Sequence, residues 1–343
     1  MFSPSRMKLA RLRLGMTRTR LAEQSGVSLR TLTAYEHDES QPSEENLLRI
    51  ADVLSVPRGF LEREAIEPVA ATAASFRKLS KASATKRNAV LATAALTLEF
   101  YEAIEKHFKL PQPDLPTLDK LTPDQAAELA RQRWKLGDRP ISNMLHLLES
   151  KGVRVASLNH DYSEIDAFCF YRDATPYVFL NTTKSAERQR FDLAHELGHL
   201  ILHSDIEMDP SSSKEREAQA NEFASHFLMP AGAVRGQLMS GAGLDRILAA
   251  RSHWKVSAMA MTHRLRELHL LSDWQYRSAC ISLSERGFRR NEPGGITPET
   301  SQLLRKVMYG SDARVSVRRA ATELELNPAE VREYVRHLVP VSA

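Results

Sequence analysis

Cysteine and long apolar runs are scarce in this sequence, and both scarcities narrow what the protein can be. Cys169 and Cys280 are the two cysteines among 343 residues, which excludes a disulfide-rich secreted scaffold and argues against a metal cage of thiolates. No apolar run approaches the roughly 20 residues that span a membrane, and residues 1–15 contain no stretch of signal-peptide type. We therefore expect a soluble, cytoplasmic protein that has no membrane partner.

A strong excess of charge is also missing. The chain carries 47 Lys and Arg against 43 Asp and Glu, a net charge of +4, which permits nucleic-acid binding without demanding it. At roughly 100–200 residues per domain, the length predicts two or three domains. Composition and motifs divide the chain into a helical domain at 1–66, a basic linker and helical connector at 67–121, a mixed domain at 122–272 and a mostly helical tail at 273–343. The predicted fold class is α+β, predominantly helical.

The first 66 residues have the pattern of four short helices. Apolar spacing predicts helices over 6–14, 17–26, 28–36 and 43–54. Three of them follow hydroxyl side chains that can cap them, at Thr17, Ser28 and Ser43. Ala22 is small where two helices would cross, and Gly26 permits a tight turn between them. This segment strongly resembles the helix-turn-helix of the lambda-repressor/Cro-like, or XRE, family, which implies binding to double-stranded DNA.

The second helix of such a unit enters the major groove with its first turns. By position in the motif, the side chains expected to face bases or nearby phosphates are Ser28, Arg30, Thr31 and Thr33. Arg18, at the start of the preceding helix, is placed to contact a phosphate, although the family usually has glutamine there. A homodimer is expected, because two-fold operators match two-fold proteins.

Charge leaves room for a second interpretation of this domain. Residues 1–66 carry ten basic and nine acidic side chains, whereas a strong phosphate-driven binder normally has a larger positive excess. A helical interaction module that binds no DNA is therefore the alternative. The basic run at 77–87 could supply further cations.

A metal-binding motif lies at His195-Glu196-Leu197-Gly198-His199. Residues four apart on a helix lie one turn apart and nearly on the same face, so both imidazoles can reach one ion. Neutral imidazole is a zinc ligand, and three protein ligands leave one position for water in a catalytic site. Glu196 lies beside that face, where it can take a proton from the water. The spacing predicts one Zn²⁺ with His195 and His199 as ligands and Glu196 as the catalytic base.

Candidates for the third ligand follow in a helical pattern at 214–230. They are Glu215, Glu217, Glu222 and His226. The motifs VFLN (178–181), RFxxAHELGHLxLH (190–203) and ExxANxFA followed by LMP (217–230) resemble the ImmA/IrrE family of zinc metallopeptidases. The resemblance implies a zincin-like domain with a small sheet and an active-site helix, and it assigns the third zinc ligand to Glu217. Glu222 is the competitor and ranks lower, because it follows the Ala-Asn pair.

Two further residues are predicted to support the ligands. Asn221 follows Glu217 by four positions and so shares its helix face, although it could simply satisfy a buried hydrogen bond. His203 continues the i, i+4 series but lies about 80° around the helix from His195, so we interpret it as a supporting residue. A structural zinc is the alternative for the whole site, but such sites usually have four protein ligands, often including cysteine.

Short β-like runs at 153–158, 165–171 and 177–180 predict a small sheet. The second and third runs could offer an edge on which an extended peptide substrate binds. Another strand is possible near 280–283. In the tail, the paired helices at 315–326 and 328–339 could form a second helix-turn-helix, although a packing or dimerisation role is the preferred interpretation.

These features together predict a DNA-binding transcriptional regulator that carries a zinc-dependent endopeptidase. The ImmA/IrrE resemblance implies a repressor-type protein as the substrate, whose cleavage would relieve repression. The alternative is a transcription factor whose zinc site senses metal or stress without hydrolysis.

Overall fold

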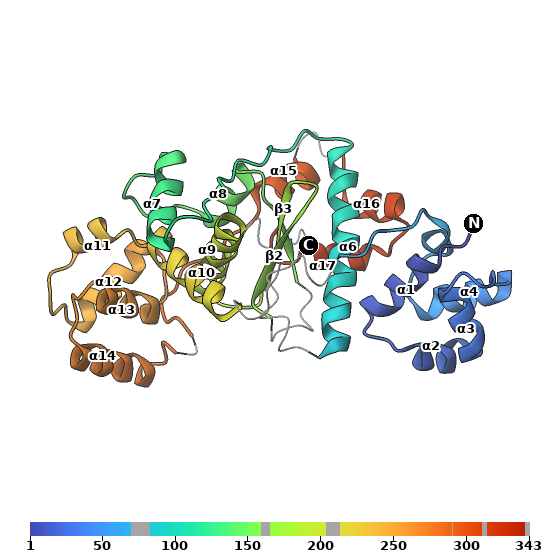
Figure 1. The fold of residues 1–343 in the computed structure, drawn as a ribbon, viewed down its shortest axis with the longest axis horizontal. Helices are drawn as coiled ribbons and strands as arrows, with labels where there is room; N and C mark the ends of the chain where they lie inside the picture. The colour runs from blue at the N-terminus through green and yellow to red at the C-terminus, as the bar shows by residue number, and fades with distance from the viewer. Residues whose placement is uncertain (70–82, 159–164, 204–212, 290, 311–313, 340–343) are drawn as a thin grey trace. The chain divides into compact units, whose positions relative to one another are not determined.

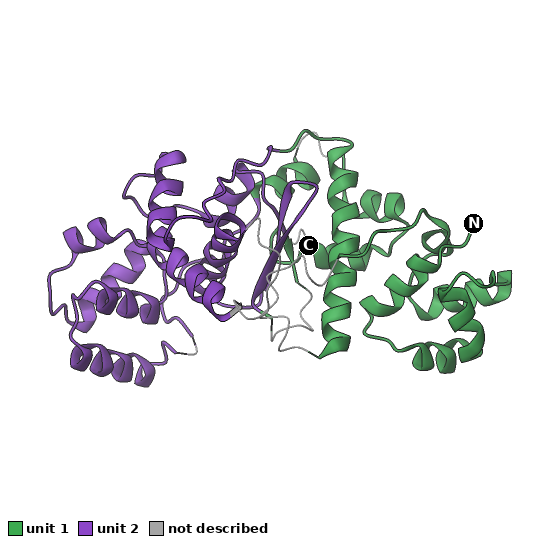
Figure 2. Cartoon of the chain, in the orientation of Figure 1, with its two compact units in different colours: residues 1–110, 156–165, 302–343 green, residues 111–155, 166–301 purple. Residues whose placement is uncertain are grey.

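The computed structural model describes residues 1–69, 83–158, 165–203, 213–289, 291–310 and 314–339. It is predominantly helical with a small three-stranded sheet, which confirms the predicted α+β class (Figure 1). The chain forms two compact units (Figure 2). Residues 1–110, 156–165 and 302–343 make the first unit, and residues 111–155 and 166–301 make the second. Within the described residues, no helix is both long and apolar enough to cross a bilayer.

The first unit begins with the four predicted short helices. They are α1 (Pro4–Arg13), α2 (Arg18–Ser25), α3 (Leu29–Glu36) and α4 (Glu44–Val53), followed by the 3-10 helix η1 (Arg58–Glu62). The predicted caps are confirmed, because Thr17, Ser28 and Ser43 each accept a hydrogen bond from a backbone N–H three residues further on. Gly26 ends α2 in the left-handed conformation, with φ at 69°, which glycine adopts at little cost.

Both ends of the chain pack on the long helix α6 (Ala84–Glu105). The other helices of this unit are α15 (Gln302–Tyr309), α16 (Val317–Leu324) and α17 (Pro328–Tyr334). Arg6 of α1 makes a two-pronged ion pair with Glu99 of α6. Phe100 of α6 packs against Tyr334 of α17, with ring centroids 5.9 Å apart. Buried charge pairing and aromatic packing thus join the N-terminal helices and the C-terminal pair in one core.

The second unit holds most of the small sheet and packs a helix against it. The helices are α7 (Pro123–Arg133), α8 (Met144–Ser150), α9 (Ala186–Leu202), α10 (Ser213–Leu228), α11 (Ala231–Gln237), α12 (Leu244–Trp254), α13 (Ala258–Glu267) and α14 (Asp273–Glu285). The strands β1 (Arg154–Ser157), β2 (Ala167–Arg172) and β3 (Thr175–Leu180) lie in the order β1-β3-β2, with β2 antiparallel to β3. The Tyr171 hydroxyl of β2 donates to the Leu200 carbonyl of α9 at 3.0 Å, so the sheet is held directly against the helix that carries the two metal-binding histidines.

Two predictions about strands are wrong. Residues 280–283 belong to α14, because Ser272 and Gln275 form a capping box that starts a helix at Asp273, and a short apolar run fits either period. The run at 177–180 lies in β3, the central strand of the described sheet, so it does not form an edge. β2 is the member of that pair that lies at the edge.

The basic linker falls partly outside the described residues. Arg77, Lys78 and Lys81 lie there, whereas Lys86 and Arg87 are in the first turn of α6. The predicted domain boundaries after residues 66, 121 and 272 stay predictions.

Candidate metal centre and DNA-binding helices

The helix α9 places His195 and His199 side by side in the interior of the second unit. Their side chains are almost fully buried, with 1% and 8% of each residue exposed. The two Nε2 atoms face one another at 3.1 Å. Two imidazole nitrogens at this separation in a buried site can share one positive ion, which is the arrangement that the spacing of the motif predicts.

Glu217 of α10 completes this group. Its carboxylate oxygens lie 3.3 Å from His199 Nε2 and 3.7 Å from His195 Nε2. One donor atom from each of the three residues lies within 4.8 Å of the others. Glu222, the competing ligand from the sequence, is not part of this group in the described residues. Two neutral nitrogens and one carboxylate are a donor set that zinc accepts, so the residues present fit the metal.

Asn221 forms a hydrogen bond with the ring nitrogen of His195 that does not face His199. Its Oδ1 lies 3.0 Å from His195 Nδ1, so Nδ1–H donates to the amide oxygen and the Nε2 lone pair points at the metal position. A partner on the far ring nitrogen sets both the tautomer and the orientation of a ligating histidine.

A second relay of hydrogen bonds supports the other histidine. His203 Nε2 lies 2.9 Å from Gln219 Oε1, and His203 Nδ1 lies 3.0 Å from His199 Nδ1. Burial lowers the pKa of His203 to about 4, although the hydrogen bond that His203 donates to Gln219 opposes this shift. A neutral His203 donates to Gln219 and accepts from His199 Nδ1–H, which again leaves the His199 Nε2 lone pair free to bind a metal. Gln219 belongs to no sequence motif and contacts His203 only through the packing of α9 on α10, so its role could not be predicted from the sequence.

Glu196 is fully buried, with 0% of its surface exposed. Its backbone carbonyl accepts a hydrogen bond from the Cys169 thiol of β2, with Sγ and O 3.5 Å apart. The strand β2 therefore adjoins the part of α9 that holds the metal-binding motif.

The close approach of α9 and α10 depends on Gly198. A Cβ atom at this position would lie 3.2 Å from Ala220 Cα and 3.3 Å from Ala220 O. Since backbone atoms cannot move aside as a side chain can, we expect Gly198→Ala to separate the helices, to destabilise the fold by about 1–3 kcal/mol and to weaken zinc binding. Urea unfolding and zinc titration test this. The control is Gly236→Ala in α11, where nothing lies within 4 Å, and equal losses in both variants would contradict the role given to Gly198.

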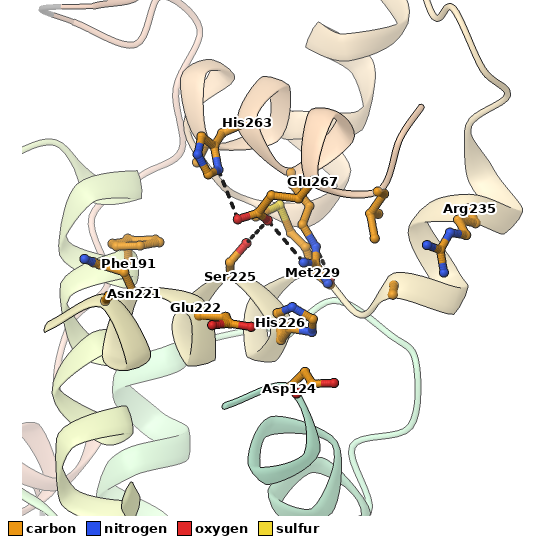
Figure 3. Close-up of a pocket in the computed structure, with 15 residues that line it drawn as sticks. Asp124, Phe191, Asn221, Glu222, Ser225, His226, Met229, Arg235, His263 and Glu267 are labelled. Carbon is orange, nitrogen blue, oxygen red and sulfur yellow. Dashed lines mark hydrogen bonds and ion pairs between the residues drawn. The ribbon is translucent and has the colours of Figure 1, made fainter. Parts of the chain in front are cut away.

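A pocket of about 860 Å³ lies beside this centre in the second unit. Asn221 and Phe191 connect it to the helices of the metal centre. Its remaining charged and polar lining side chains are Asp124, Glu222, Ser225, His226, Arg235, His263, Arg264 and Glu267 (Figure 3). The pocket is large enough for an amino-acid side chain of a bound peptide.

Glu267 lines this pocket, and we expect its carboxylate to stabilise the fold in a pH-dependent way. Burial would raise its pKa, but hydrogen bonds and charge from His263 and Arg264 lower it to about 2. Because the folded pKa lies below the unfolded value, the stabilisation is present above about pH 4.5 and is lost as the pH falls towards 2. Glu267→Gln should therefore cost about 1 kcal/mol near pH 6, after allowance for solvent screening, and progressively less in acid.

The test is to measure the free energy of unfolding of the wild type and of Glu267→Gln from about pH 6 down towards pH 2. Glu222→Gln is the control, because burial and the neighbouring Asp124 and Glu267 raise the pKa of Glu222, so loss of its charge should not destabilise the fold. A Glu267→Gln deficit that grows in acid would contradict the prediction.

The candidate DNA-contacting side chains lie on α2, α3 and the turn between them. Ser28 is exposed, but its hydroxyl caps α3 and contacts Thr31 Oγ1 at 2.7 Å, and the Thr33 hydroxyl donates to the Leu29 carbonyl. Arg18 Nε lies 3.8 Å from the Glu36 carboxylate. Arg30 is exposed and has no hydrogen bond or ion pair from its side chain in the described part of the chain. Of the five candidates, Arg30 is therefore the side chain freest to meet DNA.

Two family models match separate segments of the chain. Residues 7–61 match the helix-turn-helix family model, and residues 148–266 match the model of the IrrE N-terminal-like domain, a peptidase family. The chain joins a helix-turn-helix to an IrrE-like peptidase domain. Both resemblances seen in the sequence are thereby confirmed. The first match includes α2 and α3, and the second includes the segments of α9 and α10 that bring the His-His-Glu group together. A comparison with curated proteins gave no match.

Proposed function

We propose that this protein is a DNA-binding transcriptional regulator whose IrrE-like domain is a zinc-dependent endopeptidase that cleaves a repressor-type protein. The meeting of His195, His199 and Glu217 around one position carries the proposal. Structural zinc sites usually have four protein ligands. This group has three in the described residues, which favours a site that keeps one coordination position for a reactant.

Each residue of the centre has a distinct proposed part in peptide hydrolysis. His195, His199 and Glu217 would hold one zinc ion, which supplies a Lewis acid that polarises the substrate carbonyl and the attacking water. Glu196 takes a proton from that water and passes it to the leaving amine as the peptide bond breaks. Asn221 and His203 keep the two imidazoles in the tautomer that presents Nε2 to the metal.

The edge strand β2 supports an extended mode of substrate binding. A peptide can add to a sheet edge through main-chain hydrogen bonds, and β2 lies at the edge of the described sheet against α9. A peptide on this edge would run past the metal-binding motif. Side chains beyond the cleaved bond could then enter the neighbouring pocket.

The helix-turn-helix supplies the DNA-binding part of the proposal. The expected contacts come from Arg18, Ser28, Arg30, Thr31 and Thr33. The proposed partner is a double-stranded operator bound by a homodimer. Binding near a target gene would bring the peptidase close to the repressor it cleaves.

Genome-wide mapping of bound DNA followed by cleavage assays tests this function. Regulators encoded next to the bound sites are incubated with zinc-loaded protein, and intact-mass spectrometry detects fragments. We expect one neighbouring repressor to be cut at a defined bond. Zinc-dependent DNA affinity with no fragment from any neighbouring regulator would instead support the metal-sensing alternative.

A further inference from the structure

The last two helices of the first unit repeat the backbone design of its helix-turn-helix. Both α2 and α16 have eight residues, and each follows a hydroxyl cap, Thr17 in one case and Ser316 in the other. Each cap accepts a hydrogen bond from the backbone N–H three residues on, Arg20 and Arg319. The pair α16–α17 therefore begins as α2–α3 does.

The turns between the helices also correspond. Gly26 follows α2 with φ at 69°, and Glu325 follows α16 with φ at 52°. The N–H of Gly26 donates to the Ala22 carbonyl, and that of Glu325 donates to Ala321. A left-handed residue at this point is what redirects the chain into the second helix of such a unit.

The buried positions match along both pairs. The apolar residues that are buried at equivalent positions are Leu21 and Ala320, Val27 and Leu326, Leu32 and Val331, and Tyr35 and Tyr334. A shared cap, turn and core pattern defines α16–α17 as a second helix-turn-helix in fold. The sequence suggested this possibility but favoured packing or dimerisation.

The α16–α17 pair exposes charged side chains that are all arginines. Its acidic side chains are largely engaged, since Glu323 pairs with Lys106, Glu330 with Arg13 and Glu333 with Arg336. Four arginines are exposed and have no side-chain partner in the described residues: Arg314, Arg318, Arg319 and Arg332. Arginine side chains that are free in this way favour phosphate as their partner.

We propose that α16–α17 is a second DNA-contacting unit, which binds duplex backbone phosphates through Arg318, Arg319 and Arg332. This inference rests on the DNA binding in the proposed function. By correspondence with α2–α3, Arg318 and Arg319 are equivalent to Thr19 and Arg20, in the same first turn as Arg18, and Arg332 is equivalent to Thr33.

The α16–α17 pair is expected to contribute affinity more than sequence discrimination. Glu330 of α17 is tied to Arg13, and Asn327 donates to the Ser55 carbonyl at 2.6 Å. Two side chains of this pair, equivalent to the base-facing candidates Ser28 and Thr31 of α2–α3, are thus engaged within the protein. Phosphate contacts position a protein on DNA but do not read its sequence.

Salt-dependent DNA binding by the full-length protein tests this. The probe is a duplex of ~40 bp, which is long enough for two adjacent helix-turn-helix pairs. The wild-type protein selects it from a random-sequence library. Arg318→Ala combined with Arg319→Ala should weaken binding on the order of tenfold on every sequence and reduce the slope of log affinity against log salt by about 1.8, the value for two lost phosphate contacts. Replacement of both by lysine should restore most of the slope.

The matched control removes equal charge elsewhere. Arg277→Ala combined with Arg286→Ala alters two exposed arginines, one in α14 and one at its C-cap, and should leave the slope unchanged. An unchanged slope in the α16 variant, while wild type binds, would overturn this inference alone. Absence of wild-type binding to any selected duplex would overturn both the proposed DNA binding and this inference. A change of oligomeric state in the α16 variant at unchanged slope would assign the surface to a second copy of the chain and also overturn it.

Discussion

Glu196→Gln should abolish cleavage of the substrate repressor while the protein still binds zinc. Glutamine has the same shape but cannot take a proton, and a positioned general base contributes roughly 10²- to 10⁴-fold to rate. Glu196 is fully buried, so water cannot easily replace it as the base. Single-turnover cleavage by zinc-loaded wild type and variant measures the loss, and bound zinc is counted in the same samples.

The control for this variant is Glu222→Gln, which changes a carboxylate of the neighbouring helix outside the His-His-Glu group. It should retain zinc, and because Glu222 lines only the neighbouring pocket, it should lose far less cleavage than Glu196→Gln. If Glu196→Gln cleaves the repressor at the wild-type rate with zinc bound, the residue is not the base and the proposed mechanism fails.

Glu217→Ala should remove most of the zinc affinity. The substitution leaves His195 and His199 facing one another without the negative charge that lies 3.3 Å from His199 Nε2. Because changes to residues that merely support zinc ligands cost 10–100-fold in affinity, we expect loss of the carboxylate ligand itself to cost on the order of 10³-fold. Competition with a chromophoric chelator measures the affinity.

Glu222→Ala distinguishes the two carboxylates that the sequence left in competition. Both lie on α10, so the variants remove the same charge from the same helix. Glu222→Ala should bind zinc as the wild type does. Loss of zinc from Glu222→Ala with retention in Glu217→Ala would reverse the assignment of the third ligand.

Local patterns predicted much of the fold and of the candidate site. The caps at Thr17, Ser28 and Ser43 depend on backbone atoms three residues away, so sequence alone suffices to find them. The spacing of His195 and His199 likewise determines their shared helix face.

Non-local packing decided what the sequence left open. Glu217 was indicated by family resemblance, and its distance to the histidines appears only when α10 packs on α9. Gln219 carries no motif signal, since its contact with His203 joins two different helices. The short apolar run at 280–283 fits both strand and helix, and the capping box at Ser272 decides for the helix.

X-ray absorption at the zinc edge of the purified protein tests the central claim most directly. We expect one zinc per chain with two histidine nitrogens at about 2.0–2.1 Å, and oxygen ligands from Glu217 and from solvent. Glu217→Ala should lose this signal. A sulfur shell at about 2.3 Å, or a fourth protein ligand in place of solvent, would show a closed structural site and would contradict the account.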